Sequence, residues 1–266
     1  MSEPRQESFT KPVDLDSLPT TTLEDGQYVV RFARDAADLD AVLRLRFEVF
    51  NLELSEGLDE SFETGRDEDE FDAVCHHLMV IDRPSGQVVG TYRMQTSEMA
   101  ERYRGFYSAQ EFSIDWLPEE VLSSSLEVGR ACVALSHRNT QTLFHLWRGL
   151  ALYVATNRKR YLFGCSSLTS QDPMEGLAVM RLLERKGHVH PSLHLPPRPE
   201  LACYDDSLEL DPDFEAKLPT LFRIYLRHGA KVCGPPAIDR RFKTIDYLVI
   251  FDVDAMDPRM FETYFE

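Results

Sequence analysis

Histidine and cysteine side chains form two short groups whose atoms could coordinate a metal ion. The groups are Cys75-His76-His77 and His188-x-His190 with His194. Neighbouring residues of a strand point to opposite faces of the sheet, and neither spacing matches a common zinc pattern. We therefore expect no metal site from either group.

The backbone of residues 136–142 offers a second chemistry, which is anion binding. This segment precedes an apolar periodic stretch that predicts a helix over 140–158, between strands at 126–133 and 161–168. The first N–H groups of a helix have no acceptor within it, so they can bind a phosphate or another anion. Thr and Asn are also common helix caps, so an ordinary polar loop is the alternative.

Apolar periodicity predicts the elements that would position these residues. Asp35 can cap a helix whose apolar stripe runs to Phe50, and residues 55–72 are strongly acidic without apolar spacing. Further strands are predicted at 28–33, 77–82, 87–95 and 244–253, and further helices at 173–186 and 218–228. This mixture indicates one α/β domain over residues 27–266, after a mobile N-terminal tail at 1–26.

Composition restricts the partners and the compartment. The 266 residues include 29 Lys or Arg and 45 Asp or Glu, which gives a formal net charge of −16. Such a charge repels phosphate backbones, so we expect no nucleic-acid partner. The five cysteines form no C-x-x-C pair, and no signal peptide or long apolar run is evident. We expect a reduced, soluble, cytoplasmic protein.

Seven sequence blocks together resemble a known family. They are RFEVF at 46–50, EFDAVCHHLMV at 70–80, GQVVGTYRM at 86–94, GFYSAQEF at 105–112, LEVGRACV at 126–133, LFHLWRGLALY at 143–153 and YLRHGAKVCGPPAIDRRF at 225–242. In this order they resemble the GNAT-type L-ornithine N-acyltransferases (lyso-ornithine lipid synthases) and N-acyl amino acid synthases, also labelled putative hemolysins. A more distant similarity is to acyl-homoserine-lactone synthases, which share the Arg-x-x-Val-Phe helix and the Glu-x-x-Arg strand.

The resemblance implies a GNAT-like acyltransferase fold, with a mixed, mostly antiparallel central sheet flanked by helices. It implies transfer of a long fatty acyl chain, with or without a 3-hydroxyl, from acyl-carrier protein to the α-amine of an amino acid, ornithine first. The phosphopantetheine thioester of the carrier protein is then a co-substrate, and no further cofactor is implied. The product would be a lipid, so peripheral contact with the inner membrane is a further expectation.

Two other functions stay open. An acyl-homoserine-lactone-like synthase would need S-adenosylmethionine as acceptor, and the length of the chain and its GAKVCGPPA block argue against it. A non-enzymatic hemolysin or lipid-binding protein would be expected to have a signal peptide, a spanning segment or a basic amphipathic helix, and the sequence suggests none of them.

Carried over onto this sequence, the resemblance implies a polar set around the reaction centre. Its catalytic members are Glu127 and Arg130, and its substrate-binding members are Arg46, Asp69, Asp72 and Arg93. The alternative is a salt-bridge network that holds the N-terminal helix and the acidic segment on the sheet. Because buried ion pairs fix geometry while adding little net stability, one set can serve both purposes.

Glu127 is implied to be the general base. An amine attacks a thioester only when neutral, and its proton must leave after the tetrahedral adduct forms. About a tenth of an α-amine is already neutral at pH 7, so positioning should matter more than basicity. On a regular strand Glu127 and Arg130 would face opposite sides, but Gly129 permits a bulge that re-aims one of them.

The segment HRNTQT at 137–142 stands where acetyl-CoA-using GNAT enzymes have a glycine-rich phosphate loop. Glycines there let backbone N–H groups approach a pyrophosphate closely, and this segment has none. The difference favours acyl-carrier protein over CoA as the donor. The expected donor-binding residues are Val133, Arg138, Asn139, Thr140, Gln141 and Thr142.

An acidic carrier protein would need a basic face on this acidic chain. The expected docking residues are Arg148, Arg158, Lys159 and Arg160, with Arg181, Arg185 and Lys186 as further basic residues. Solvated helix charges are the alternative for each of them.

Cys165, Ser166 and Ser167 suggest a nucleophile. However, no Gly-x-Ser-x-Gly turn surrounds them, and the GNAT reaction uses no covalent intermediate. We expect them to line the core or the pocket for the acyl chain.

Overall fold

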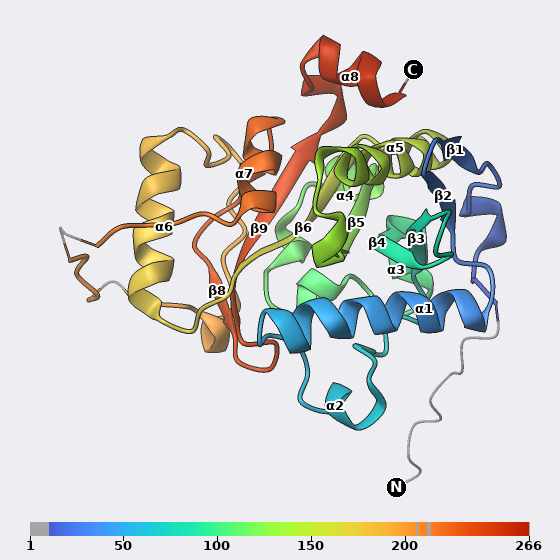
Figure 1. The fold of residues 1–266 in the computed structure, drawn as a ribbon. Coiled ribbons are helices and arrows are strands. Elements are labelled where there is room, and N and C mark those ends of the chain that lie inside the picture. The colour runs from blue at the N-terminus through green and yellow to red at the C-terminus, as the bar shows by residue number, and fades with distance from the viewer. Residues whose placement is uncertain (1–10, 206, 212–213, 266) are drawn as a thin grey trace, which may run out of the picture. The chain divides into compact units, whose positions relative to one another are not determined.

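The computed structural model describes residues 11–205, 207–211 and 214–265 (Figure 1). They divide into two compact units, each built from separate segments of the chain. The described parts of Met1–Gly105, Val128–Lys159 and Tyr264–Glu266 form the first unit. Phe106–Glu127 and Arg160–Thr263 form the second.

An antiparallel sheet organises the first unit. Its strands, in pairing order, are β1 (Leu23–Asp25), β2 (Tyr28–Phe32), β3 (His76–Asp82) and β4 (Val88–Thr96). Buried and half-buried residues alternate along β2, whereas β3 and β4 are buried along nearly their whole length. Continuous burial is typical of strands that are covered on both faces. The last part of β5 (Ser125–Val133) also belongs to this unit.

Two long helices cover this sheet. They are α1 (Ala36–Phe47) and α5 (Thr140–Asn157), and each begins at a side chain that caps its first turn, Asp35 and Asn139 respectively. Helix α1 packs on β3 and β4, and α5 packs on β2, β3 and β4. Gly149 permits the close approach of α5, because a Cβ atom there would overlap a leucine side chain of β3. The shorter helices are η1 (Leu15–Ser17), η2 (Glu48–Glu53), α2 (Ser61–Thr64), α3 (Ser97–Arg102) and η5 (Leu135–His137).

The second unit is built on the antiparallel pair β6 (Tyr161–Leu168) and β9 (Thr244–Asp252). Two short strands, β7 (Lys231–Val232) and β8 (Ala237–Asp239), also pair antiparallel with β9. The start of β5 pairs in parallel with β6. The helices are η3 (Tyr107–Gln110), η4 (Ile114–Trp116), α4 (Glu119–Ser123), α6 (Pro173–Arg185), η6 (Pro199–Leu201), α7 (Thr220–Arg227), η7 (Val253–Ala255) and most of α8 (Pro258–Phe265).

These pairings confirm a mixed α/β fold with mostly antiparallel strands and flanking helices. The single domain expected over residues 27–266 stays a prediction. None of the described helices is long and apolar enough to span a membrane.

The mobile tail predicted for residues 1–26 is too long. Residues 1–10 lie outside the described residues, but the chain that follows is packed within the first unit. Leu18 is buried, and the carbonyl oxygen of Val13 lies 2.7 Å from Nε2 of His76. Strand β1 then pairs with β2 through backbone hydrogen bonds. Such an edge strand is held by its backbone, so its polar sequence gave no sign of it.

Candidate active site

Six charged side chains of the first unit meet in one buried group, named here the arginine-aspartate cluster. They come from the last turn of α1, the loop before β3, the middle of β4 and the second half of β5. The members are Arg46, Asp67, Asp69, Asp72, Arg93 and Arg130. The structure thus brings together five of the residues expected at the site and adds Asp67.

Arg46 lies at the centre of this cluster and is fully buried. Its Nη1 and Nη2 atoms donate to the two carboxylate oxygens of Asp72, at 2.6 and 3.2 Å. Its Nε atom donates to Oδ2 of Asp67 at 2.7 Å. Arg46 thus pairs with Asp72, which the resemblance implied for the site, and with Asp67, which it did not. A bidentate arginine-carboxylate pair fixes both side chains in one plane.

Arg93 pairs with the two aspartates that the resemblance implied for the site. Its Nη1 atom donates to Oδ1 of Asp69 at 2.5 Å and to Oδ1 of Asp72 at 3.1 Å. Its guanidinium carbon also lies 5.6 Å from the centre of the Phe71 ring. Asp72 therefore accepts hydrogen bonds from both Arg46 and Arg93, and it links α1 to β4.

Arg130 joins the cluster through an unusual backbone conformation. Its φ angle is +48°, in the left-handed region that residues with a Cβ atom adopt only at a cost of about 1–2 kcal/mol. Its Nη2 atom donates to Oδ2 of Asp69 at 3.1 Å, and its Nε atom lies 3.5 Å from Oδ2 of Asp67. The irregularity expected beside Gly129 is thus at Arg130 itself, and it re-aims that side chain.

The arginines of the cluster stabilise the ionised form of its aspartates. Burial alone would raise the pKa of Asp72, but the nearby Arg46 and Arg93 guanidinium groups hold it well below its ordinary value. Burial is also the largest influence on the pKa of Asp69 and would raise it, but the guanidinium groups of Arg93, Arg130 and Arg46 together lower it below its ordinary value. Three arginines face three aspartates, so the formal charges of the cluster cancel.

Glu127 has a separate environment, in the second unit. One carboxylate oxygen accepts the backbone N–H of Tyr107 at 2.8 Å, and the other accepts the N–H of Ser108 at 2.7 Å. These donors lie in the first turn of η3, where N–H groups have no helical acceptor. The side chain is buried and held in one orientation. Tyr107 and Ser108 lie in the GFYSAQEF block, but no feature of that block predicted their hydrogen bonds to Glu127.

The expected donor-binding segment forms the start of α5. Oδ1 of Asn139 accepts the N–H of Thr142 at 2.9 Å, so the cap already uses one of the free N–H groups. Thr140 and Gln141 are exposed there, whereas Thr142 is buried. Arg138 donates from Nε to the carbonyl of Val133 at 3.1 Å and forms an ion pair with the exposed Glu53.

Residues 45–148 match the family model described as an acetyltransferase (GNAT) domain. The L-ornithine N(alpha)-acyltransferase of Rhizobium meliloti (strain 1021) is 33% identical over 245 residues, which cover 88% of this chain and 83% of that protein. The protein of the same name from Agrobacterium fabrum (strain C58 / ATCC 33970) is 30% identical over 250 residues, which cover 90% and 85%. The chain belongs to the L-ornithine N(alpha)-acyltransferase family.

Solved structures of similar fold include the acyl-homoserine-lactone synthase LasI, with a TM-score of 0.49, 14% identity and coverage of 91% of this chain and 96% of that one. Another is FeeM, an N-acyl amino acid synthase from uncultured soil microbes, with a TM-score of 0.47, 10% identity and coverage of 86% and 91%. Family membership and the GNAT domain make this protein an acyltransferase.

The structure changes the expected docking face of this acyltransferase. Lys159 is 8% exposed, and its Nζ atom donates to Ser97 at 2.8 Å and to Glu98 at 2.5 Å. A buried, paired ammonium cannot meet a partner protein, so Lys159 is removed from that face. The sequence could not show this, because a lysine looks the same whether its amine is buried or exposed. Arg158 is exposed at the end of α5, and Arg148 is half-buried.

Arg160 is also exposed, but it already pairs with Asp252 at 2.8 Å and Asp254 at 3.1 Å. These contacts lie within the second unit. The arginine would have to exchange partners before it could bind an acidic protein. This leaves Arg148 and Arg158 as the docking candidates on α5 and at its end.

Two of the residues considered for other chemistries, His76 and Cys165, are held within the fold. Both ring nitrogens of His76 lie at hydrogen-bond distance from oxygens, those of Val13 and of the Tyr153 hydroxyl. Burial raises the pKa of Cys165 well above its ordinary value, which disfavours a thiolate nucleophile.

A group of acids that the sequence did not suggest lies in the second unit. The carboxylates of Glu111, Asp239 and Asp246 have oxygens within 4.8 Å of one another. Burial raises the pKa of Asp246. Neighbouring buried carboxyl groups commonly share a proton, and this is sufficient to explain the group without a metal ion.

Proposed function

We propose that this acyltransferase moves a long fatty acyl chain, with or without a 3-hydroxyl, from acyl-carrier protein to the α-amine of an amino acid. Ornithine is the first choice of acceptor. The observation that carries this proposal is the identity of 30–33% over about nine-tenths of the chain with proteins named L-ornithine N(alpha)-acyltransferase. The product would be lyso-ornithine lipid or a related N-acyl amino acid.

In this proposal Glu127 is the general base. The two backbone N–H groups of η3 hold its carboxylate in a fixed orientation, and a fixed base avoids the entropy cost of orienting itself at each turnover. Its role is to accept the proton that the amine loses as the new amide bond forms and the thiol of the carrier leaves. The thioester carbon-sulfur bond breaks in that step, so no covalent enzyme intermediate is needed.

The arginine-aspartate cluster has a positioning role in this proposal. Its internal pairs leave no net formal charge. It holds the second half of β5 through Arg130, three residues after Glu127. The strained Arg130 backbone is maintained by the ion pairs at its side chain, as strained residues in proteins generally require. The resemblance implies substrate contacts for Arg46, Asp69, Asp72 and Arg93.

Acyl-carrier protein is the proposed donor because residues 137–142 lack the glycines of a pyrophosphate loop. Their Cβ atoms stand beside the first N–H groups of α5, and the Asn139 cap uses the N–H of Thr142. The phosphopantetheine of a carrier protein has a single phosphodiester, so it needs fewer such donors than CoA.

An acceptor survey tests the proposal. Purified protein would be incubated with 3-hydroxyacyl-carrier protein and one amine at a time: ornithine, lysine, glutamine, glycine or S-adenosylmethionine. The proposal predicts that ornithine gives the highest rate and that mass spectrometry locates the acyl group on its α-nitrogen. Preferred use of S-adenosylmethionine would contradict it and favour a lactone synthase instead.

A further inference from the structure

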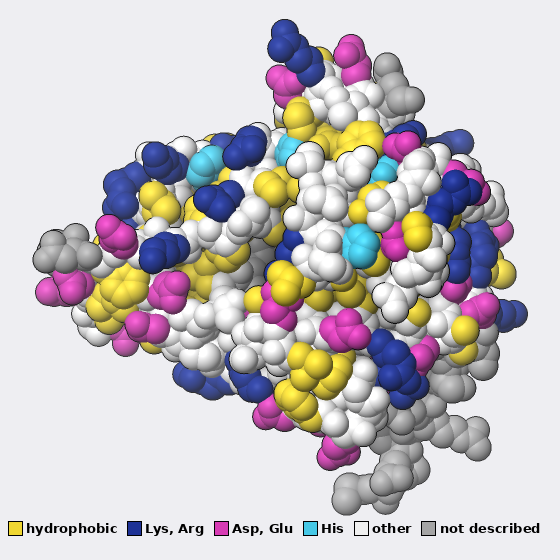
Figure 2. Space-filling model, viewed as in Figure 1, with side chains coloured by type: hydrophobic (Ala, Val, Ile, Leu, Met, Phe, Trp, Pro, Cys, Tyr) yellow, Lys and Arg dark blue, Asp and Glu magenta, His cyan; other side chains and the backbone are white. Residues whose placement is uncertain are grey.

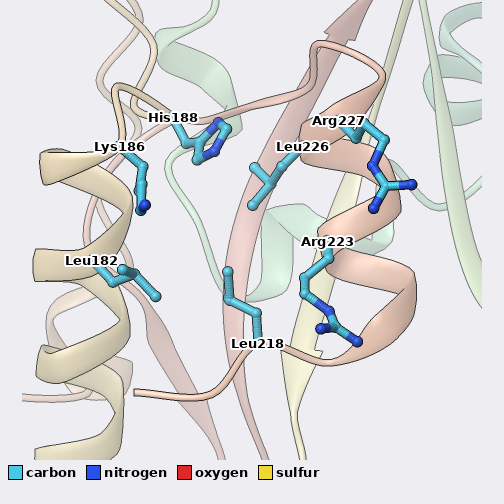
Figure 3. A pocket seen from close by; sticks show the side chains of 7 residues that line it. All are labelled: Leu182, Lys186, His188, Leu218, Arg223, Leu226 and Arg227. Carbon is cyan, nitrogen blue, oxygen red and sulfur yellow. The ribbon is translucent and has the colours of Figure 1, made fainter. Parts of the chain in front are cut away.

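A hollow of about 300 Å³ lies between α6 and α7 in the second unit (Figure 3). Its lining residues come from the end of α6, the segment just after it, the segment just before α7, and α7 itself. They are Leu182, Lys186, His188, Leu218, Arg223, Leu226 and Arg227. None of them is part of the polar set assigned to the acyl-transfer reaction.

The floor of the hollow is apolar. Leu182 on α6, Leu218 before α7 and Leu226 on α7 point into the space between the two helices (Figure 3). Leu226 is buried, and the other two are partly exposed. An apolar floor open to water favours a ligand that covers it, because apolar surface leaves water at about 25 cal/mol per Å².

The rim of the hollow is basic. Lys186 stands at the end of α6, and Arg223 and Arg227 stand one turn apart on α7 (Figure 3). All three side chains are exposed, and none forms an ion pair with another described residue. The nearby acid Glu184 is already paired with Arg181 at 3.0 Å. The rim therefore presents three cationic side chains to a ligand in the hollow.

Positive charges also act on the histidine that lines the hollow. The pKa of His188 is lowered, first by burial and then by the positive charges of Lys231 and Lys186. In Figure 2, dark-blue Lys and Arg side chains gather over α6 and α7, with hydrophobic side chains between them. A local positive region on a chain of net charge −16 attracts anions that the rest of the surface repels.

We propose that this hollow binds an anionic amphiphile, that is, one apolar chain ending in a carboxylate or a phosphate. The chain would cover the three leucines, and the head group would bind between Lys186 and the two arginines. Arginine suits both head groups, because its planar donors bind two oxygens at once. The volume is at the small end of ligand pockets, which fits one chain and not the two chains of a phospholipid.

Binding measured by titration calorimetry on the full-length protein tests this inference. The probes are laurate and dodecyl phosphate below their micelle concentrations, dodecyltrimethylammonium with the same chain and a cationic head, and propionate with the same head and almost no chain. The inference predicts saturable binding of laurate and dodecyl phosphate at one site. The cationic and the short probe should each bind at least about tenfold more weakly.

Two variants locate the site. The double variant Arg223→Glu/Arg227→Glu should weaken laurate binding at least about tenfold, since it reverses two charge-assisted contacts. The control Arg240→Glu makes the same arginine-to-glutamate replacement at an exposed position outside the hollow, and it should leave laurate binding unchanged. Circular dichroism checks that the variants stay folded. The readout is binding alone, so the result is independent of the acyl-transfer assay.

Three outcomes would overturn the inference. The first is equal affinity for the anionic and the cationic probe, which would mean non-specific apolar binding. The second is unchanged laurate binding by the double variant, which would place the ligand elsewhere. The third is binding to phosphatidylglycerol vesicles without binding to monomeric laurate, which would make the basic rim a membrane-surface contact.

Discussion

Arg46 and Asp72 form a bidentate pair, with distances of 2.6 and 3.2 Å, where neither side chain reaches solvent. The pair joins the end of α1 to the loop before β3, and Arg93 and Asp67 complete its hydrogen bonding. Buried charges are tolerated only when they are paired in this manner. The pair is therefore a point at which the fold and the candidate site depend on the same contacts.

Replacement of Arg46 by alanine should destabilise the protein strongly. Arg46→Ala would leave Asp67 and Asp72 buried without their main cation, at a cost of about 3–5 kcal/mol. Arg44→Ala is the matched control, because Arg44 lies on the same helix and pairs with Asp40 in an exposed position. It should cost less than about 1 kcal/mol. Urea unfolding measures both, and similar costs for the two variants would contradict the burial of the cluster.

Asp67 shows what the sequence could and could not predict about this cluster. The resemblance supplied Arg46, Asp69, Asp72, Arg93 and Arg130, and the structure brings these five together. Asp67 was overlooked because the acidic segment 55–72 has no apolar period from which the direction of each carboxylate could be inferred. Its position depends on the loop path, which is fixed in part by the hydrogen bond from its N–H to the carbonyl of Leu43.

The helices and strands of the fold also divide into those that the sequence predicted and those that it did not. Strong apolar periods predicted α1, α5, α6 and the central strands. The short helices between residues 97 and 123 were not predicted, because they are held by tertiary contacts and have too few turns to leave a period. The left-handed Arg130 could not be located either, although the neighbouring Gly129 suggested an irregularity.

Stability should fall as the pH is lowered from 6.5 to 4, in part because of His77. Burial lowers the pKa of this imidazole to about 4, whereas its unfolded value is near 6.5. The unfolded chain therefore binds a proton in this range while the folded chain does not. The contribution of His77 is present above pH 6.5 and is lost toward pH 4, by about 2–3 kcal/mol.

His77→Gln tests this pH dependence. Glutamine can still donate to the carbonyl of Asp72, which lies 3.0 Å from Nε2 of His77, but it does not titrate. Urea unfolding of the two proteins between pH 7.5 and pH 4.5 should give a shallower decline for the variant. Parallel curves would show that His77 binds its proton equally well in the folded and unfolded chains.

Glu127→Gln should lower turnover by about 10²–10⁴-fold, which is the usual range for a lost general base. Glutamine offers one carboxamide oxygen for the two N–H groups of Tyr107 and Ser108, so the variant should also lose about 1–3 kcal/mol of stability. Rates must therefore be measured at a temperature where unfolding curves show both proteins fully folded. Near-normal turnover of the folded variant would mean that water or another carboxylate, and not Glu127, accepts the proton of the amine.

Donor choice should favour acyl-carrier protein. With the same acyl chain, kcat/KM should be at least about tenfold higher for the carrier-protein thioester than for the CoA thioester, because the glycine-free segment 137–142 offers little to a pyrophosphate. Both donors would be assayed with ornithine at saturation. Equal or better use of the CoA thioester would contradict acyl-carrier protein as the preferred donor.

The most direct test is the lipid content of a bacterial host that makes no ornithine lipid. The host would express either this chain or its Glu127→Gln variant, and extracted lipids would be analysed by mass spectrometry with fragmentation. The account predicts N-acylated ornithine with a long chain in the first strain, and at least about a hundredfold less in the second. A strain that accumulates folded wild-type protein and no N-acylated ornithine would contradict the assignment of ornithine as the acceptor.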